Sequence, residues 1–262
     1  MEDRHVPGPH GPVPVRLYRP ATAPRTALLW MHGGGFRAGS LDMPEAHDVS
    51  LALAARAQAL VVSVGYRLAS ADVVYPVPLD DVFAAWRWLC TDPGHGHLAV
   101  RALGGASAGA ALALGAAIRG RDDGLPAHRV LLAYPFAHYP NPALDEATVL
   151  ALAERSGIPR ILPPTVESMV AEYVGRTTDL PRLALPGAAR LDGLPPTTLL
   201  LSQYDDLRPS GELLHRQLES VGVPVAALVA LGAAHGHLNS ADEPPVVVDS
   251  LRFLADALAG SG

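Results

Sequence analysis

The chain has 262 residues, a formal net charge of −6, and 49% hydrophobic against 18% charged residues. This length and composition predict one large globular domain with a core rich in alanine, leucine and valine, and they exclude a disordered chain. The acidic balance argues against nucleic acid or an anionic membrane as the main partner.

The chain carries no pattern that would direct it to a membrane or to secretion. Residues 1–14 are polar and rich in proline, unlike a secretory signal, and no apolar run reaches membrane-spanning length. Cys90 is the single cysteine, so an intrachain disulfide and a zinc cluster built on cysteines are both excluded. We therefore expect a soluble cytoplasmic enzyme or binding protein.

Short apolar runs alternate along the chain with longer helical patterns. The predicted strands are Val13–Tyr18, Thr26–Met31, Leu60–Val64, Leu98–Leu103, Arg129–Tyr134, Thr197–Ser202 and Val225–Leu231. Most are continuous apolar runs, which are typical of parallel strands covered on both faces. The predicted helices between and after them are Pro44–Ala57, Leu79–Cys90, Ala108–Ile118, Pro209–Val221 and Pro245–Ala259. This alternation predicts an α/β fold, with a mostly parallel central sheet flanked by helices.

One region interrupts the alternation. Residues 136–196 contain many prolines and two helical patches, Asp145–Ser156 and Pro164–Val174, but no predicted strand. An insertion of this length between two core strands is typical of a lid or cap over the carboxyl edge of the sheet. Because no linker or repeat divides the chain, we predict a single domain over residues 1–262, with a small helical cap at 136–196.

The segment Gly105–Gly109, GASAG, follows the predicted strand Leu98–Leu103 and opens a helix. A sharp strand–turn–helix bend of this kind exposes the serine oxygen above the sheet, and its neighbours must be small because the bend crowds the backbone. The free N–H groups at the start of the helix would face any negative charge that develops there. The pattern also arises by chance in chains rich in glycine and alanine, so the assignment of Ser107 as a nucleophile depends on its context.

The segment His32–Phe36, HGGGF, directly follows the predicted strand Thr26–Met31. Three consecutive glycines let the backbone approach a substrate and direct N–H groups toward it, as an oxyanion hole built from main chain requires. The alternative is a plain flexible turn, which is less favoured because this loop leaves the same sheet edge as Ser107. We expect His32 itself to be a structural residue that holds the loop by hydrogen bonding.

A serine nucleophile needs a base, and the base needs a carboxylate that orients it. Asp205 and Asp206 follow the predicted strand Thr197–Ser202, at the kind of strand end where active sites of open α/β sheets assemble. We prefer Asp205, with Asp206 as the substitute. The alternative for this pair is to cap the helix that begins near Pro209.

Two histidines, His235 and His237, follow the predicted strand Val225–Leu231. We prefer His235 as the base because it lies nearer the strand end and precedes a glycine, and we expect His237 to be a lining or surface residue. No histidine and carboxylate cluster has the spacing of metal ligands, so we predict no metal. Other histidines in loops rich in proline and glycine are expected to be solvated: His5, His10, His95 and His97.

Together these motifs resemble the hormone-sensitive-lipase-like carboxylesterases of the α/β-hydrolase superfamily, over nearly all of Thr26–Ala259. Further stretches carry the resemblance: Val64–Ala69 (VGYRLA), Tyr75-Pro76 followed by Asp80-Asp81 and Ala84–Leu89, Leu194–Pro196, Tyr204–Arg208 and His235-Gly236. The resemblance implies the α/β-hydrolase fold. It also implies a set of site residues: a catalytic triad of Ser107, Asp205 and His235, with oxyanion donors from Gly34, Gly35 and the amide of Ala108.

The chain departs from this family in a few places. Asp206 stands where the family usually has proline, which favours Asp205 as the triad carboxylate. Ala106 stands where the family usually has an acidic residue, and Ser70-Ala71 stands where it usually has Pro-Glu. The N-terminal extension that usually forms half of the cap is largely missing. We therefore expect the cap to be built mainly from 136–196, with a more open acyl or alcohol pocket.

The resemblance implies a serine carboxylesterase that hydrolyses small to medium carboxylic esters through an acyl-enzyme. We expect it to need no cofactor and to take a small-molecule ester as its partner. The resemblance to the family also implies a homodimer. Two alternatives stay open. The first is another hydrolase that uses the same triad: an amidase, a formamidase, or a sugar-acetyl or feruloyl esterase. The second is a protein in which the triad is repurposed or catalytically inactive: a biosynthetic cyclase, a lyase or a small-molecule receptor.

Overall fold

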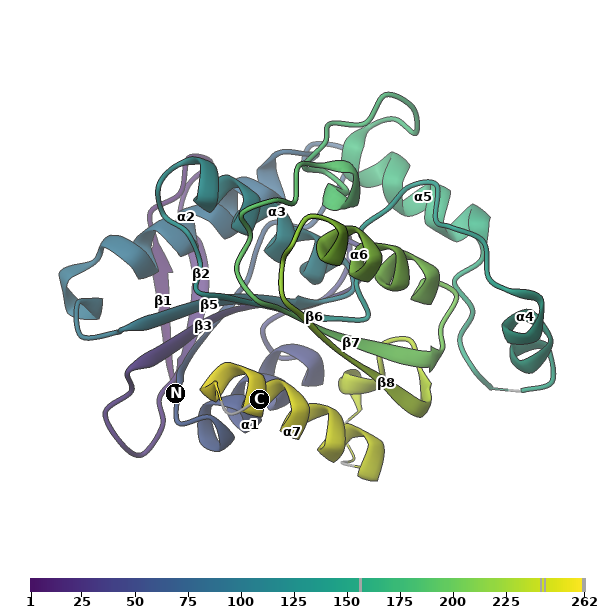
Figure 1. Ribbon diagram of the computed structural model, residues 1–262. Coiled ribbons are helices and arrows are strands. Elements are labelled where there is room, and N and C mark those ends of the chain that lie inside the picture. Colours follow the sequence, from purple (N-terminus) through teal and green to yellow (C-terminus); the bar gives the residue numbers. More distant parts are fainter. Residues whose placement is uncertain (156, 241, 243, 261–262) are drawn as a thin grey trace.

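The computed structural model describes residues 1–155, 157–240, 242 and 244–260 (Figure 1). In this part of the chain one sheet of eight strands forms the centre, in the order β1-β2-β4-β3-β5-β6-β7-β8. β1 pairs with β2 and β2 with β4 in antiparallel fashion, and the remaining neighbours are parallel. The strands are β1 (Glu2–Val6), β2 (Val13–Tyr18), β3 (Thr26–Met31), β4 (Leu60–Val64), β5 (Val100–Ala106), β6 (Arg129–Ala133), β7 (Thr197–Tyr204) and β8 (Val225–Ala234).

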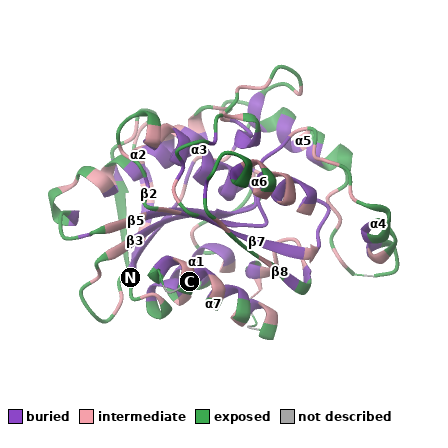
Figure 2. Ribbon diagram, in the orientation of Figure 1, coloured by how far each residue is buried: buried purple, intermediate pink, exposed green. Residues whose placement is uncertain are grey.

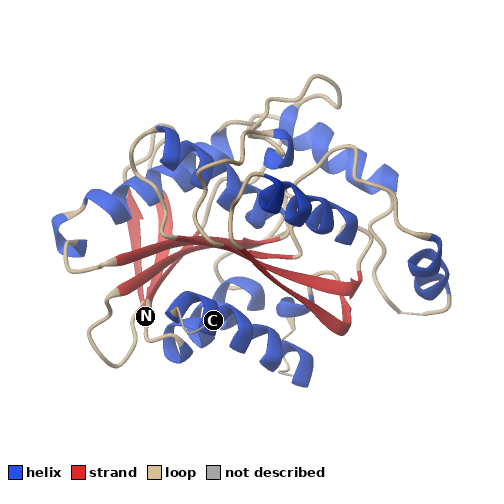
Figure 3. Ribbon diagram, viewed as in Figure 1, coloured by secondary structure: helices blue, strands red, loops and turns tan. Residues whose placement is uncertain are grey.

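Helices cover both faces of this sheet, as Figure 3 shows. One face carries α1 (Pro44–Arg56) and α7 (Pro245–Ala259), and the other carries α2 (Val77–Thr91), α3 (Ala108–Asp122) and α6 (Arg208–Ser220). The central strands are buried on both sides (Figure 2), which is why they have continuous apolar sequences. The predicted α/β class and flanking helices are therefore confirmed.

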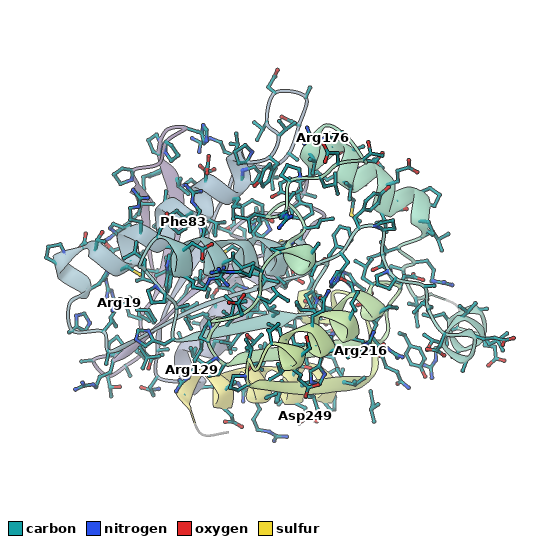
Figure 4. All side chains as sticks on the ribbon, turned by 45° about the horizontal axis from the view of Figure 1, so that its top comes forward. Arg19, Phe83, Arg129, Arg176, Arg216 and Asp249 are labelled. Carbon is teal, nitrogen blue, oxygen red and sulfur yellow. The ribbon has the colours of Figure 1, made fainter. Side chains whose placement is uncertain are left out.

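Each helical layer encloses its own apolar core. The core under α1 and α7 includes Trp30, Leu53 and Leu254, all fully buried. A polar contact also ties this layer to the sheet, because the Arg129 guanidinium at the start of β6 donates to the carbonyl oxygen of Leu258 in α7. Arg129 is labelled in Figure 4. The opposite core is larger and contains α3, whose alanines and glycines allow close packing against the sheet.

Three of the predicted strands end one to three residues from their predicted ends, with β7 and β8 longer and β6 shorter, and two further strands differ more. The strand predicted at Leu98–Leu103 is shifted to Val100–Ala106, so it continues through two glycines that look like a turn in the sequence. β1 was not predicted at all, because its residues Glu2–His5 are polar and exposed, as befits an edge strand. The predictions followed apolar runs, and neither of these segments is one.

The described residues of the segment 136–196 form two α-helices, α4 (Glu146–Ala153) and α5 (Pro163–Val174), and the short 3-10 helix η2 (Pro186–Ala188). The carboxylate of Asp145 caps α4 by accepting from the Thr148 amide at 2.9 Å, and the predicted end of this patch, Ser156, lies outside the described residues. α4 stands at the side of the molecule and is largely exposed (Figure 2). α5 packs onto the body instead, since the Tyr173 ring stacks on Phe36 with centroids 3.9 Å apart. In the described part of the chain, no helix has the length and apolar character needed to cross a membrane.

Candidate active site

Ser107 occupies a strained turn between β5 and α3. Its φ of 53° lies in the left-handed region, where serine is uncommon, and its amide donates to the carbonyl oxygen of Ala133 at 2.9 Å. The turn leaves no room for a side chain two positions before or after Ser107. A Cβ on Gly105 would lie 2.4 Å from the Gly109 oxygen, and one on Gly109 would lie 2.3 Å from the Met31 oxygen. The GASAG sequence is therefore the one that lets the serine reach the carboxyl edge of the sheet.

The structure brings Ser107, His235 and Asp205 together at this edge. Ser107 Oγ lies 2.8 Å from His235 Nε2, and His235 Nδ1 lies 2.8 Å from Asp205 Oδ2. The other oxygen of Asp205 accepts from the Leu207 amide at 2.8 Å, so this buried carboxylate is held from two directions. Asp205 follows β7 and His235 follows β8, and both strands run parallel to β5. The three side chains thus meet although they come from three separate parts of the sequence.

The environment of His235 favours its charged form. Burial by itself lowers the pKa of this imidazole, but the charge of Asp205 and its hydrogen bond outweigh burial, so the pKa of His235 is raised. The carboxylates of Glu45 and Asp206 act in the same direction from greater distance. The site is therefore arranged to accept a proton on His235.

The glycine-rich loop adopts backbone conformations that glycine permits. Gly34 and Gly35 have φ angles of 107° and 61°, and a Cβ on Gly34 would lie 2.1 Å from the Ala38 oxygen. His32 holds the loop as expected: its Nδ1 lies 2.7 Å from the Gly33 oxygen, and its ring stacks on Tyr66. The loop is thus a fixed structure and not the plain flexible turn that the sequence left open.

A cavity of about 380 Å³ lies over Ser107. Its polar side is formed by Ser107, His235, Glu45, Asn239 and the loop glycines Gly34 and Gly35. Its remaining wall is mostly apolar. Met169 of α5 and three residues of the segment before it contribute, together with the residues that precede α1 and α6: Phe136, Pro159, Ile161, Met43 and Leu207. Ile161 also borders a second cavity of about 350 Å³, which lies between the segment 136–196 and Asp206. An apolar chamber with a few convergent polar groups suits a small organic ligand.

Asp206 does not reach the site and does not cap the next helix. Its carboxylate accepts from Arg160 Nε and Nη2 at 2.9 and 2.8 Å and from the Ile161 amide at 2.8 Å. α6 begins after Leu207 without a side-chain cap, so the capping alternative was wrong. Asp206 instead ties the segment 136–196 to the loop that carries Asp205.

Two histidines differ from their predicted surroundings. His237, expected at the surface or in the pocket lining, is bonded to Ser202 Oγ at 3.0 Å and Ser250 Oγ at 2.9 Å, and burial lowers its pKa to about 4. It is a neutral structural residue that joins β7 to α7. His95, expected to be solvated, is buried edge-on against Trp88. Loop composition predicted exposure for His95, and distance from the strand end predicted a lining or surface position for His237. Contacts with Trp88 and with the two serines, which come from distant parts of the chain or from another element, decide otherwise.

Sequence reasoning missed two buried residues behind the site, Glu45 and Tyr134. They are bonded to each other, Glu45 also accepts from the Gly33 amide, and the Tyr134 ring lies against His235. A carboxylate in a helix that directly follows the glycine loop is the one sequence signal that could have pointed to this pair. Among the described residues, no group of three or more His, Cys, Asp or Glu side chains is placed to hold a metal ion.

Comparison with known proteins places these features in a family context. A family model described as "alpha/beta hydrolase fold" matches residues 28–239. Esterase LipI of Mycobacterium tuberculosis is 34% identical over 95% of this chain and 78% of its own length. Ethyl acetate hydrolase of Pseudomonas putida is 32% identical over 90% of this chain and 76% of its own length. The solved structure of an esterase from Pyrobaculum calidifontis matches with a TM-score of 0.87 and 32% identity, covering 99% of this chain and 84% of that one.

Proposed function

The chain belongs to the hormone-sensitive-lipase-like carboxylesterase family of the α/β-hydrolase superfamily, and on this premise we propose that it is a serine carboxylesterase acting on small to medium carboxylic esters. The observation that carries the proposal is the hydrogen-bonded chain from Ser107 through His235 to Asp205, which opens into a cavity of about 380 Å³. A serine held by a histidine and a buried carboxylate is the arrangement that activates a hydroxyl for acyl transfer.

The reaction proceeds in two acyl-transfer steps. His235 takes the proton of Ser107 Oγ while this oxygen attacks the ester carbonyl carbon, and the carbonyl oxygen becomes negatively charged. The resulting imidazolium then protonates the departing alcohol, which leaves an acyl group on Ser107. Water attacks this acyl-enzyme in the same way, with His235 again as base, and frees the acid. Asp205 keeps the Nδ1 proton in place and stabilises the imidazolium.

The developing oxyanion is held by the amides of Gly34, Gly35 and Ala108. Two observations support this role: both loop glycines line the cavity over Ser107, and Ala108 is the first residue of α3, where an amide has no partner within the helix. Each donor of this kind contributes about 3–4 kcal/mol to transition-state stabilisation.

The segment 136–196 serves as the cap of a single domain over residues 1–262. Met169 of α5 and Ile161 before it form part of the wall of the cavity, which supports this role. The N-terminal strand β1 lies at the opposite end of the sheet from β7 and β8, so it is poorly placed to cover the site. A cap from one segment is consistent with a pocket open enough for medium acyl chains.

The first test is hydrolysis of p-nitrophenyl esters from acetyl to decanoyl by the wild type and by Ser107→Ala. We expect robust turnover by the wild type and a kcat about 10⁵–10⁶-fold lower in the variant, the scale seen when a triad nucleophile is removed. A loss below tenfold would refute Ser107 as nucleophile. An aryl formamide is assayed in parallel, and its turnover without any ester turnover would replace the esterase with an amidase.

We also propose that the protein forms a homodimer. β8 is the last strand of the sheet and leaves its outer backbone groups without a neighbouring strand in the described chain. Val229 and Leu231, on alternate positions of this strand, are 38% and 73% exposed. A second copy that aligns its own β8 here would pair the backbone and cover these side chains.

A further inference from the structure

Glu45 is a buried carboxylate that the proposed reaction leaves unexplained. It lies in the first turn of α1 and is only 3% exposed. The described residues supply no arginine within ion-pair distance of it, and burial raises the pKa of its carboxyl. A carboxylate in such a place costs several kcal/mol unless hydrogen bonds compensate for lost water. Because burying this carboxylate costs free energy of folding and Glu45 lines the cavity over Ser107, we expect it to serve a function there.

Four hydrogen bonds hold Glu45 in one position. Its Oε2 accepts from the Gly33 amide at 2.5 Å, and its Oε1 accepts from the Tyr134 hydroxyl. Its backbone oxygen accepts from Trp30 Nε1 at 2.9 Å, and its amide donates to Asn239 Oδ1 at 3.3 Å. Both carboxylate oxygens are therefore fixed relative to β3, β6 and the loop after β8.

One of these contacts sets the position of the oxyanion loop. The Gly33 amide donates to Glu45, so it is not free to donate to a substrate oxygen, and this bond fixes the start of the segment that continues with Gly34 and Gly35. A Cβ on Gly33 would lie 2.6 Å from Glu45 Oε2 and 3.2 Å from Ser107 Cβ. The loop is thus pressed between the carboxylate and Ser107, without space to shift.

The other contact reaches the proposed base. Tyr134 is fully buried, and its ring lies edge-on to His235 and to His237 at centroid distances of 5.0 and 5.3 Å. Burial and the charge of Glu45 raise the pKa of Tyr134 far above its ordinary range, so the phenol keeps its proton and donates it to the carboxylate. Glu45 therefore fixes the aromatic surface on which the His235 ring rests.

The strand before Ser107 brings no carboxylate to this region, because position 106 is alanine. Family resemblance leads us to expect an acidic residue at 106, but Ala106 is fully buried in the same apolar cluster as Trp30 and Tyr134. Strand β5 thus supplies no charge there, and Glu45 reaches this region from the helix on the same side of the sheet.

We propose that Glu45 is a positioning residue of this active site, holding the oxyanion loop through Gly33 and the His235 ring through Tyr134, while its negative charge stabilises the imidazolium formed during acyl transfer. The proposal rests on the esterase function proposed above. The charged and titratable groups facing His235 are Asp205, in direct contact, with Asp206, Glu45 and the neutral His237 and Tyr134 farther away.

The test compares Glu45→Gln with Asp48→Asn, a matched control that removes one carboxylate from the exposed face of the same helix. Glutamine can still accept from Gly33, so this variant removes the charge and keeps most of the geometry. We expect kcat on p-nitrophenyl acetate to fall by roughly 10- to 100-fold, below the loss of an oxyanion donor, with KM changed less than about threefold. The acid limb of kcat/KM against pH should move to lower pH, because His235 loses a neighbouring negative charge. Asp48→Asn should change neither.

Two further variants separate charge from position. Glu45→Asp keeps the charge but is too short for both contacts, so kcat should fall while the acid limb stays near that of the wild type. Tyr134→Phe removes the hydroxyl that bonds Glu45 and leaves the ring beside His235 without its anchor, so it should also lower kcat. If Glu45→Gln fails to fold, Glu45→Asp and Tyr134→Phe still test the proposal. A kcat equal to that of the wild type in both variants would overturn it. An unmoved acid limb in folded Glu45→Gln would overturn the charge role.

A second measurement does not depend on the natural substrate. It follows the rate at which a fluorophosphonate probe phosphonylates Ser107, against pH, in the wild type and in every variant. A wild type that reacts with the probe but hydrolyses no ester would overturn the esterase function alone. Equal probe rates in the wild type, Glu45→Gln and Tyr134→Phe would overturn the positioning role alone.

Discussion

At the scale of single residues, the site depends on backbone conformations that few residue types can adopt. It also depends on one histidine, His235, whose pKa is lowered by burial and raised by a neighbouring carboxylate. Ser107 sits at positive φ between glycines whose Cβ positions are blocked by backbone atoms. His235 is shielded from water, which opposes its charge, but Asp205 lies 2.8 Å away and compensates. The same aspartate that orients the ring therefore also sets the pH range in which the ring can act as a base.

This balance leads to a prediction about pH. His235 must be neutral to accept the proton of Ser107, and its pKa is raised above the ordinary 6.5, so kcat/KM should rise with pH along an acid limb whose midpoint lies above 6.5. Asp205→Asn removes the charge that raises this pKa and should move the limb to lower pH, while kcat falls by about 10⁴-fold because the tautomer is wrong. A limb that stays in place in the variant would contradict the assignment of Asp205.

At the scale of elements, the segment 136–196 is attached to the body at a few defined points. The Asp206 carboxylate accepts hydrogen bonds from the Arg160 guanidinium and the Ile161 amide. Tyr173 of α5 stacks on Phe36, which ends the glycine loop. Ile161 thus has its backbone held by the loop of Asp205 while its side chain borders both cavities. Asp206 therefore connects the segment 136–196, which we propose as the cap, to the loop that carries Asp205.

Breaking this connection should change which esters are accepted. In Asp206→Ala the segment around Ile161 loses its anchor, so the two cavities should merge more readily and longer chains should fit. We expect the ratio of kcat/KM for octanoyl over acetyl esters to rise severalfold. Asp249→Ala, which breaks the exposed pair of Asp249 with Arg252 on α7, is the control and should leave the ratio unchanged. An unchanged ratio in folded Asp206→Ala would count against Asp206 as a determinant of pocket size.

At the scale of the whole molecule, the sheet brings distant parts of the chain to one edge and leaves one strand exposed. β5, β7 and β8 are parallel, so the turns that follow them open on the same side, where Ser107, Asp205 and His235 meet. The order of strands also makes β8 an edge, with Leu231 73% exposed. One topology therefore accounts for the position of the site and for the surface proposed for dimerisation.

The proposed dimer predicts a mass of twice 27.4 kDa in solution. Light scattering coupled to size-exclusion chromatography measures it directly. Leu231→Arg places a charge on the edge strand and should shift the mass toward the monomer, since charged edges oppose strand pairing. Leu150→Arg changes an exposed leucine on α4 and should leave the dimer intact. A wild-type monomer at high protein concentration would refute the dimer.

The amino-acid sequence by itself determined the features that arise from local pattern. Continuous apolar runs alternating with helical periodicity were enough for the α/β class, because burial on both faces imposes that pattern. Glycines beside Ser107 and at Gly34-Gly35 marked the tight turns, because other residues do not fit there. β1 escaped notice because an exposed edge strand needs no apolar residues.

Only the tertiary structure decided which polar groups face one another. Ser107 and His235 are separated by 128 positions, and Glu45 and Tyr134 by 89, so no local pattern links either pair. The same holds for His237, which we expected in the pocket lining or at the surface. Its ring instead bonds Ser202 of β7 and Ser250 of α7. Contacts between distant segments follow from the order and direction of strands, and these are properties of the folded sheet.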